Sequence, residues 1–165
     1  MSFIRLDALE LALRLAKIGA KEEGGNNNGR WIRIFAQATD VGLKEGFPWC
    51  AAFVMYCLSQ AGFDVKRIKN RASVGFIEQW ASAHNLIVKR PLRGDLVTFR
   101  FDDNDWPDHI GFVRRVLGLG PILTLSTVEG NTSSGDQGSQ DDGGGVYIRR
   151  RVVRRSKVCF IRIPD

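Results

Sequence analysis

Two cysteines share one helical segment of this sequence, and only one of them has a position suited to chemistry. Cys50 falls in the first turn of the apolar stretch PWCAAFVMYCLSQA. Unpaired N–H groups and the helix dipole at that end stabilise a thiolate and could hold an oxyanion beside it. Cys57 lies two turns further on, where nothing activates it. We therefore expect Cys50 to be a nucleophile, and Cys57 and Cys159 to be core residues.

A cysteine nucleophile needs a base, and the sequence offers two histidines. His109 begins the apolar strand HIGFV, from where its ring could enter a cleft with Nδ1 oriented by a neighbour. His84 follows a helix and is expected at the surface. Glu129 and Asn131 end the strand TLSTVEGN, and either could accept from the imidazole N–H and fix its tautomer. The residues thus predict a Cys50–His109 pair with Glu129 or Asn131 as the orienting group.

Other polar and aromatic residues near these positions could bind a substrate or a metal ion. Trp49 and Trp106 flank the cysteine and the histidine, and we expect them to line a substrate groove, although Trp49 could equally belong to the core. A calcium site needs about six to eight oxygen ligands, and only Asp40 and Glu45 precede Cys50 closely. The acidic turn at 102–108 is expected to be solvated. No cysteine or histidine has zinc-ligand spacing, so we predict no metal and no cofactor.

The elements that must position these residues change character along the chain. Apolar periodicity predicts helices first. They cover residues 6–20, 30–39, 48–61 and 73–83, with Ser73 as a helix N-cap and Pro48 in a first helical turn. Short β-rich segments follow at 95–101, 110–117, 122–129, 146–153 and 158–163, and 130–145 reads as a long flexible loop. Helices followed by strands predict an α+β fold with an antiparallel sheet.

Bulk properties narrow the class of protein. A chain of 165 residues, 44% hydrophobic, fits a single domain spanning 1–165. The chain contains no apolar run long enough for a transmembrane helix, and its start does not resemble a signal peptide. The net charge of +6 suits an anionic partner, but no nucleic-acid-binding motif is present, so we predict no nucleic acid. The basic run at 149–157 is expected to be a strand with a solvated cationic face.

Several segments in order carry a resemblance to a known family. GFPWCAAFVMYCLSQAG, RGDLVTF, HIGFV and TVEGN follow one another as they do in the CHAP family, and the preceding AKIGAKEEGGNNNGRWIRIF is similar to the leader of one branch. CHAP proteins are cysteine- and histidine-dependent amidohydrolases and peptidases with a papain-like, NlpC/P60-type fold. The resemblance implies N-terminal helices packed on a C-terminal antiparallel sheet of about five or six strands.

The resemblance also implies roles and a substrate. Cys50 would be the nucleophile, His109 the general base and later the acid, Glu129 the residue orienting His109, and Asn131 an assisting polar group. The pair at 94–95 would be structural. The substrate would be the peptide part of bacterial peptidoglycan, cut within the peptide or at the sugar–peptide amide.

These implications lead to an expectation about the biological setting. We expect a monomeric bacteriophage endolysin that is made in the host cytoplasm, does not insert stably into membranes and reaches the wall through holin-type release. Two alternatives stay open: a secreted or tail-delivered toxin effector with the same chemistry, and a non-catalytic module that binds cell wall or polyanions.

Overall fold

The computed structural model describes residues 3–42, 45–102, 104–118, 120–134 and 143–165. Four α-helices come first: α1 (Ile4–Lys17), α2 (Arg30–Ala36), α3 (Cys50–Gln60) and α4 (Val74–Ala83). Five strands follow: β1 (Leu96–Phe99), β2 (His109–Val116), β3 (Ile122–Thr132), β4 (Gly145–Arg154) and β5 (Val158–Ile161). Short 3-10 turns at Val65–Arg67 and Arg155–Lys157 complete the described elements. The predicted α+β class is confirmed.

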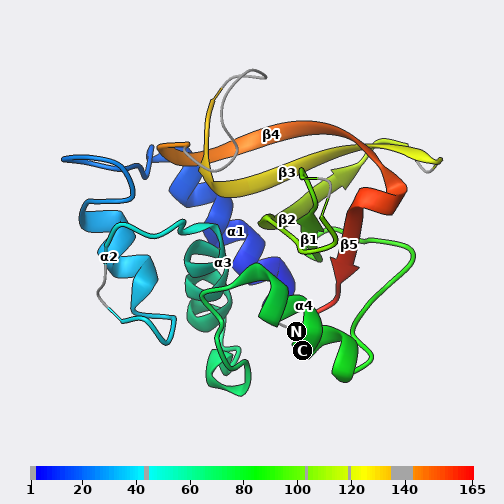
Figure 1. Ribbon diagram of the computed structural model, residues 1–165, viewed down its shortest axis with the longest axis horizontal. Helices are drawn as coiled ribbons and strands as arrows, with labels where there is room; N and C mark the ends of the chain where they lie inside the picture. Colours follow the sequence, from blue (N-terminus) through cyan, green and yellow to red (C-terminus); the bar gives the residue numbers. More distant parts are fainter. Residues whose placement is uncertain (1–2, 43–44, 103, 119, 135–142) are drawn as a thin grey trace.

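The strands form one antiparallel sheet in the order β4-β3-β2-β1-β5. Figure 1 shows the helices on one side of this sheet, with the long strands β3 and β4 crossing above α1 and α3. The predicted antiparallel sheet of about five or six strands is therefore confirmed, with five strands in the described residues. β5, the last strand of the chain, pairs with β1 and covers its free edge.

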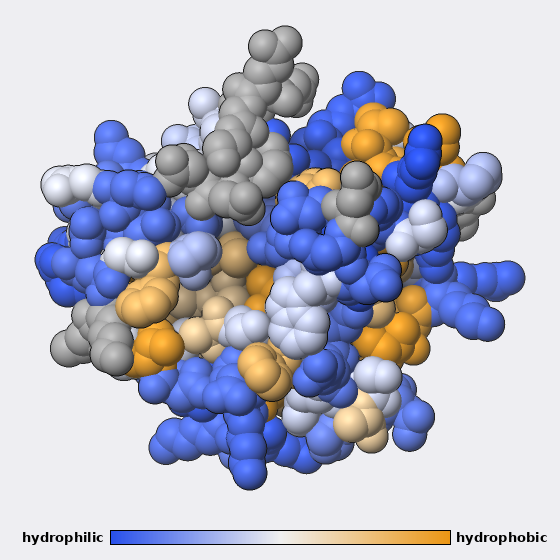
Figure 2. All heavy atoms as spheres, in the orientation of Figure 1, coloured by the Kyte–Doolittle hydropathy of each residue, from blue (hydrophilic) through white to orange (hydrophobic). Residues whose placement is uncertain are grey.

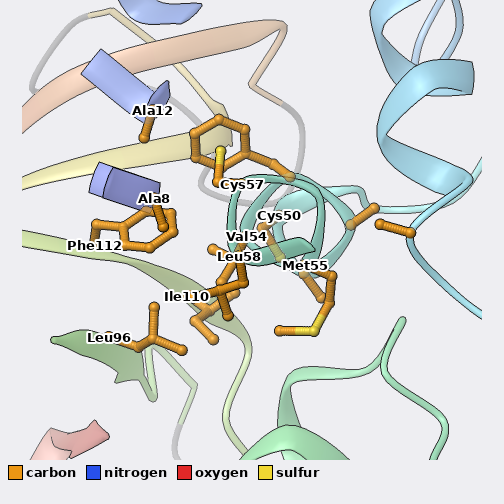
Figure 3. Packing of buried hydrophobic residues seen from close by; sticks show 14 of the residues in the cluster. Ala8, Ala12, Cys50, Val54, Met55, Cys57, Leu58, Leu96, Ile110 and Phe112 are labelled. Carbon is orange, nitrogen blue, oxygen red and sulfur yellow. The ribbon is translucent and has the colours of Figure 1, made fainter. Parts of the chain in front are cut away.

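Helix α3 is the centre of the main core, because it is apolar on nearly every side. Ala8 and Ala12 of α1 and Phe112 of β2 lie together on one side of α3 (Figure 3). Phe53 of α3 meets Phe112 edge-on, with ring centroids 6.2 Å apart. Helix α3 thus packs against α1, α2 and the strands β2 and β3, so its start has a fixed place beside the sheet.

The opposite face of the sheet carries a second, smaller apolar cluster. It consists of Val97, Phe99, Val113, Leu123, Leu125 and Phe160. Side chains alternate along a strand, so β3 contributes Val128 to the helix-facing core and Leu125 to this second cluster. Glu129 has the same parity as Leu125, and it therefore leaves β3 on the side away from Val128.

A buried carboxylate joins the start of the sheet to both ends of the described chain. Asp95 accepts two hydrogen bonds from Arg162, at 3.0 and 2.8 Å, and one from the Leu92 N–H at 2.7 Å. Arg5 of α1 lies 4.0 Å from the same carboxylate. Gly94, with φ of +88°, approaches Arg5 so closely that a Cβ would lie 2.8 Å from its carbonyl oxygen. The Gly94–Asp95 pair thus has a structural role in this fold.

Several boundaries differ from those expected. The first helix spans Ile4–Lys17 rather than 6–20, because Gly19 adopts φ of +70° and ends it. Helix α3 begins at Cys50, so Pro48 lies outside it, and Ser73 is an N-cap without a side-chain cap bond. The loop expected at 130–145 is shorter, since β3 runs on to Thr132; its residues 135–142 lie outside the described part.

The basic run was the main error of interpretation. Arg150 and Arg154 are exposed as expected, but Arg149 and Arg151 point to the other side of β4 and are buried. Only half of the arginines in this strand are therefore solvated, and of the buried ones Arg151 contacts Glu129.

Candidate active site

Cys50 is the first residue of α3 and lies at the edge of the core. Its N-cap, Trp49, makes no side-chain cap bond, so no side chain caps the first N–H groups of the helix from that position. The cysteine is 4% exposed and lines a cavity of about 260 Å³. A thiol with these surroundings can react with a group that enters the cavity.

His109 is the first residue of β2, and its ring connects Cys50 to the sheet. The Nε2–H donates to Glu129 Oε2 at 2.8 Å, and the ring is also in hydrogen-bonding contact with the Cys50 thiol. Nε2 is therefore the oriented nitrogen, not Nδ1 as the sequence interpretation had it, and Nδ1 is left to serve the cysteine. The ring is 1% exposed, so it lies behind Cys50 rather than in the cavity wall.

Glu129 lies beside His109 because a glycine stands opposite it. Gly111 of β2 is its cross-strand partner, and a Cβ at Gly111 would lie 2.6 Å from Glu129 Cγ. The carboxylate is wholly buried, and Thr127 donates its hydroxyl to Oε1. The spacing His109-x-Gly111 thus has a physical reason: the histidine binds the acid, and the glycine makes room for it.

Asn131 follows at an irregular point in β3, where the register with β4 shifts between Glu129 and Thr132. It is buried and has φ of +56°, a conformation that asparagine tolerates. Gly130 presses against α3, since a Cβ there would lie within 2.8 Å of Phe53 and Trp49 side-chain atoms. The bulge therefore fixes β3 to the helix that carries Cys50, and the assisting role of Asn131 stays a prediction.

Arg151 of β4 completes the buried group, and the sequence analysis missed it. Its Nε donates to Glu129 Oε1 at 2.9 Å, and its Nη2 donates to Oε2. A signal was present in the sequence: in a strand, alternate residues of an arginine run face opposite sides. Reading the run as a solvated face overlooked that alternation.

His109, Glu129 and Arg151 stabilise one another's charged forms. Burial lowers the pKa of His109, but its hydrogen bonds to Cys50 and Glu129 and the negative charge of Glu129 outweigh burial and raise that pKa to about 9. Burial likewise raises the pKa of Glu129, but Arg151 and His109 hold it well below its usual range. His109 is therefore held as an imidazolium and Glu129 as a carboxylate at neutral pH.

The cavity at Cys50 is mainly apolar. Figure 2 shows it as a recess of tan and orange atoms among blue ones, near α2 and the start of α3. Its lining comes from α2, the segment that joins α2 to α3, the start of α3, the start of α4 and the segment before β2. The lining residues are Ile32, Ala36, Val41, Phe47, Pro48, Trp49, Cys50, Ala52, Ala72, Ser73, Val74, Pro107 and Asp108.

The two tryptophans occupy different places. Trp49 is 2% exposed, stacks on Phe35 and donates from Nε1 to Glu22 at 2.8 Å, so most of its ring belongs to the core. Trp106 is 46% exposed and lies over Gly75 of α4. It lines a neighbouring pocket that shares Pro107 with the cavity at Cys50. Of the two, Trp106 offers the larger surface to a ligand.

The remaining cysteines and polar clusters lie elsewhere. Cys57 is wholly buried, and burial raises its pKa well above the ordinary value. Cys159 is half-buried rather than a core residue, and burial raises its pKa to about 11. His84 Nδ1–H donates to the Trp80 carbonyl oxygen at the end of α4. No cluster of three or more metal-ligating side chains occurs among the described residues, which leave out Asp103 of the acidic turn.

Comparison with known proteins gave one match. The family model described as CHAP domain matches residues 42–131, more than half of the chain. This segment contains Cys50, His109, Glu129 and Asn131, but it ends before β4. Neither the curated proteins nor the solved structures include a match to this chain.

Proposed function

Because the chain belongs to the CHAP domain family, whose members are cysteine- and histidine-dependent amidohydrolases and peptidases, we propose that it hydrolyses an amide bond in the peptide part of peptidoglycan. The observation that carries the proposal is the chain of contacts from Cys50 through His109 to Glu129, which begins at the floor of a cavity. In this proposal Cys50 is the nucleophile, His109 the acid–base group and Glu129 the residue that orients it.

The reaction would proceed in two halves. The Cys50 thiolate attacks the amide carbon, and the oxyanion develops near the uncapped N–H groups at the start of α3. The His109 imidazolium gives its proton to the leaving amine, so the C–N bond breaks and a thioester remains. His109 then takes a proton from water, the hydroxide attacks the thioester, and the carboxylic acid product and Cys50 are released.

The substrate would lie across the two neighbouring pockets. The apolar cavity would hold the residue next to the scissile amide, and exposed Trp106 would contact the chain further along. Trp106→Ala should therefore raise KM several-fold with little change in kcat. An unchanged KM would remove Trp106 from the binding surface.

We also propose an endolysin role, in which the enzyme acts on the host wall. None of the helices in the described part of the chain has the length and apolar character needed to span a bilayer. The net charge of +6 would favour approach to an anionic envelope. Expression inside a bacterium should lyse it only when a membrane-permeabilising protein is co-expressed, and lysis without that protein would contradict this route.

The first test is clearance of purified peptidoglycan by wild type, Cys50→Ala and the matched control Cys57→Ala on the same helix. Wild type and Cys57→Ala should clear the wall and release amines without new reducing ends, and Cys50→Ala should do neither. Equal clearance by all three would mean that Cys50 is not the nucleophile. Binding of wild type to the wall with no released amine would favour a non-catalytic binding module instead.

A further inference from the structure

Arg151 of β4 donates hydrogen bonds to both oxygens of the Glu129 carboxylate. It lies outside the segment 42–131 that the family model covers. We propose that Arg151 is a positioning residue of the active site, which fixes Glu129 and keeps it charged while His109 gains and loses its proton. The inference rests on the proposed function, because it assigns a partner to the group that orients the catalytic histidine.

The guanidinium of Arg151 makes a bidentate contact with the Glu129 carboxylate. Nε donates to Oε1 at 2.9 Å, Nη2 donates to Oε2, and Nη2 also lies 3.4 Å from the Thr132 hydroxyl. A two-point contact fixes the plane of the carboxylate, which a single donor would not do. Oε2 is also the atom that accepts from His109 Nε2 at 2.8 Å, so fixing that plane fixes the direction of the imidazole.

Arg151 is itself held in place by two aromatic rings. Its guanidinium carbon lies 5.6 Å from the centroid of Phe99 and 5.3 Å from that of Phe101, and these two rings stack on each other. Both rings lie 6.0 Å from the His109 ring as well. The same aromatic pair thus supports the arginine and the histidine, and Arg151 has none of the freedom of a surface arginine.

The charged groups around Glu129 show why a permanent cation matters. His109 faces it from β2, Arg151 faces it from β4, and Cys50 reaches it through His109. Arg149 of β4 is directed elsewhere, to the Ser133 carbonyl. When His109 gives its proton to a leaving amine, it ceases to be a cation. A wholly buried Glu129 would then lack a counter-charge unless Arg151 supplied one.

The test uses the fact that the chain has only two histidines. Imidazole NMR signals of His109 are followed against pH in wild type, Arg151→Gln, Arg151→Lys and the control Arg150→Gln, with the exposed His84 as internal reference. The rate at which iodoacetamide alkylates Cys50 is measured on the same samples by mass spectrometry of its peptide. Neither readout requires peptidoglycan, so a wrong substrate would not affect them.

In wild type and Arg150→Gln, we expect a hydrogen-bonded His109 Nε2–H signal between about pH 8 and about pH 5, and the same Cys50 alkylation rate in the two proteins at each pH. In Arg151→Gln, Glu129 should take up a proton within that range. The Nε2–H signal should then move, and at about pH 5 the alkylation rate of Cys50 should be about tenfold lower than in wild type. Arg151→Lys keeps the charge and should restore most of the rate at that pH.

Two results would overturn the proposal: a folded Arg151→Gln that keeps the wild-type profile, or an Arg150→Gln that changes as much as Arg151→Gln does. If Arg151→Gln does not fold, Arg151→Lys decides, because loss of the bidentate contact should still shift its His109 Nε2–H signal, and an unchanged signal would overturn the role. If the His109 signal and the Cys50 alkylation rate depend on Arg151 but the protein does not clear peptidoglycan, the positioning role is supported and the proposed substrate is contradicted.

Discussion

Two buried carboxylates in this molecule are held by arginines, and they do different things. Asp95 accepts from Arg162 and from the Leu92 N–H, and it ties α1 and the end of the chain to the start of β1. Glu129 accepts from Arg151 and also from His109. The partner other than arginine makes the difference: a backbone N–H keeps its proton, whereas an imidazole can pass its proton on. A buried acid–arginine pair is therefore structural or functional according to what else the carboxylate binds.

The largest expected effect separates the two carboxylates directly. Glu129→Gln should lower kcat by about 10²- to 10⁴-fold, because His109 loses the anion that orients it and supports its charge. Asp95→Asn should leave kcat per folded molecule nearly unchanged, but it should cost about 1–3 kcal/mol of unfolding free energy, because the partly exposed Arg162 loses its charged hydrogen-bond partner.

Wall clearance and urea unfolding, measured on both variants, check this prediction. A catalytic defect in Asp95→Asn at full stability would remove the distinction between the two pairs.

A smaller effect is expected from the glycine that accompanies each carboxylate. Gly111→Ala places a Cβ 2.6 Å from Glu129 Cγ and should push the carboxylate from His109, with about a 10- to 100-fold loss of kcat. Gly94→Ala places a Cβ 2.8 Å from the Arg5 carbonyl oxygen at φ of +88° and should cost about 1–3 kcal/mol of stability instead. Crystal structures of both variants, with their kinetics, would show which contact gives way.

The smallest effect concerns pH. The pKa of His109 is raised to about 9, so the stability that its charged form contributes is fully present below its ordinary pKa of 6.5 and is lost as pH rises through about 9. The stability difference between wild type and His109→Ala should shrink by about 1 kcal/mol between about pH 7 and about pH 8.

The Asp95–Arg162 pair should show no such change over that interval, because hydrogen bonding to Asp95 raises the pKa of Arg162 above an already high value. Urea titrations of wild type, His109→Ala and Asp95→Asn at the two pH values provide the measurement. A constant difference for His109→Ala would mean that its charge is not coupled to folding.

The helices, the strands and most of the candidate site residues could be predicted from the sequence. Helices and strands were predicted because apolar residues recur with the period of each, and Cys50 and His109 stood out because each opens an element. The end of the first helix was misplaced because the alanines around Gly19 hid its role as a stop. Such errors arise where the neighbouring residues favour a helix but a single residue, here Gly19, adopts a backbone conformation that ends it.

What the sequence could not supply was contact across strands. The choice of Nε2 over Nδ1 depends on which face of β3 carries Glu129, and the room for Glu129 depends on its register with Gly111. Arg151 joined the site only because β4 pairs with β3 and turns alternate arginines inward. All three features depend on which strands pair and in which register, and that register is determined by the whole sheet.

The pairing of β4 with β3 also has a consequence for the order in which the protein acquires activity during synthesis. Helix α3 and strands β1 to β3 leave the ribosome before Arg151 does, and β1 keeps an open edge until β5 is made. Until β4 is made, Glu129 has no permanent counter-charge, and until β5 is made, the sheet that carries His109 lacks its outer strand beside β1. A nascent chain therefore carries Cys50 long before Glu129 has its arginine, and the complete sheet exists only after β4 and β5 have been made.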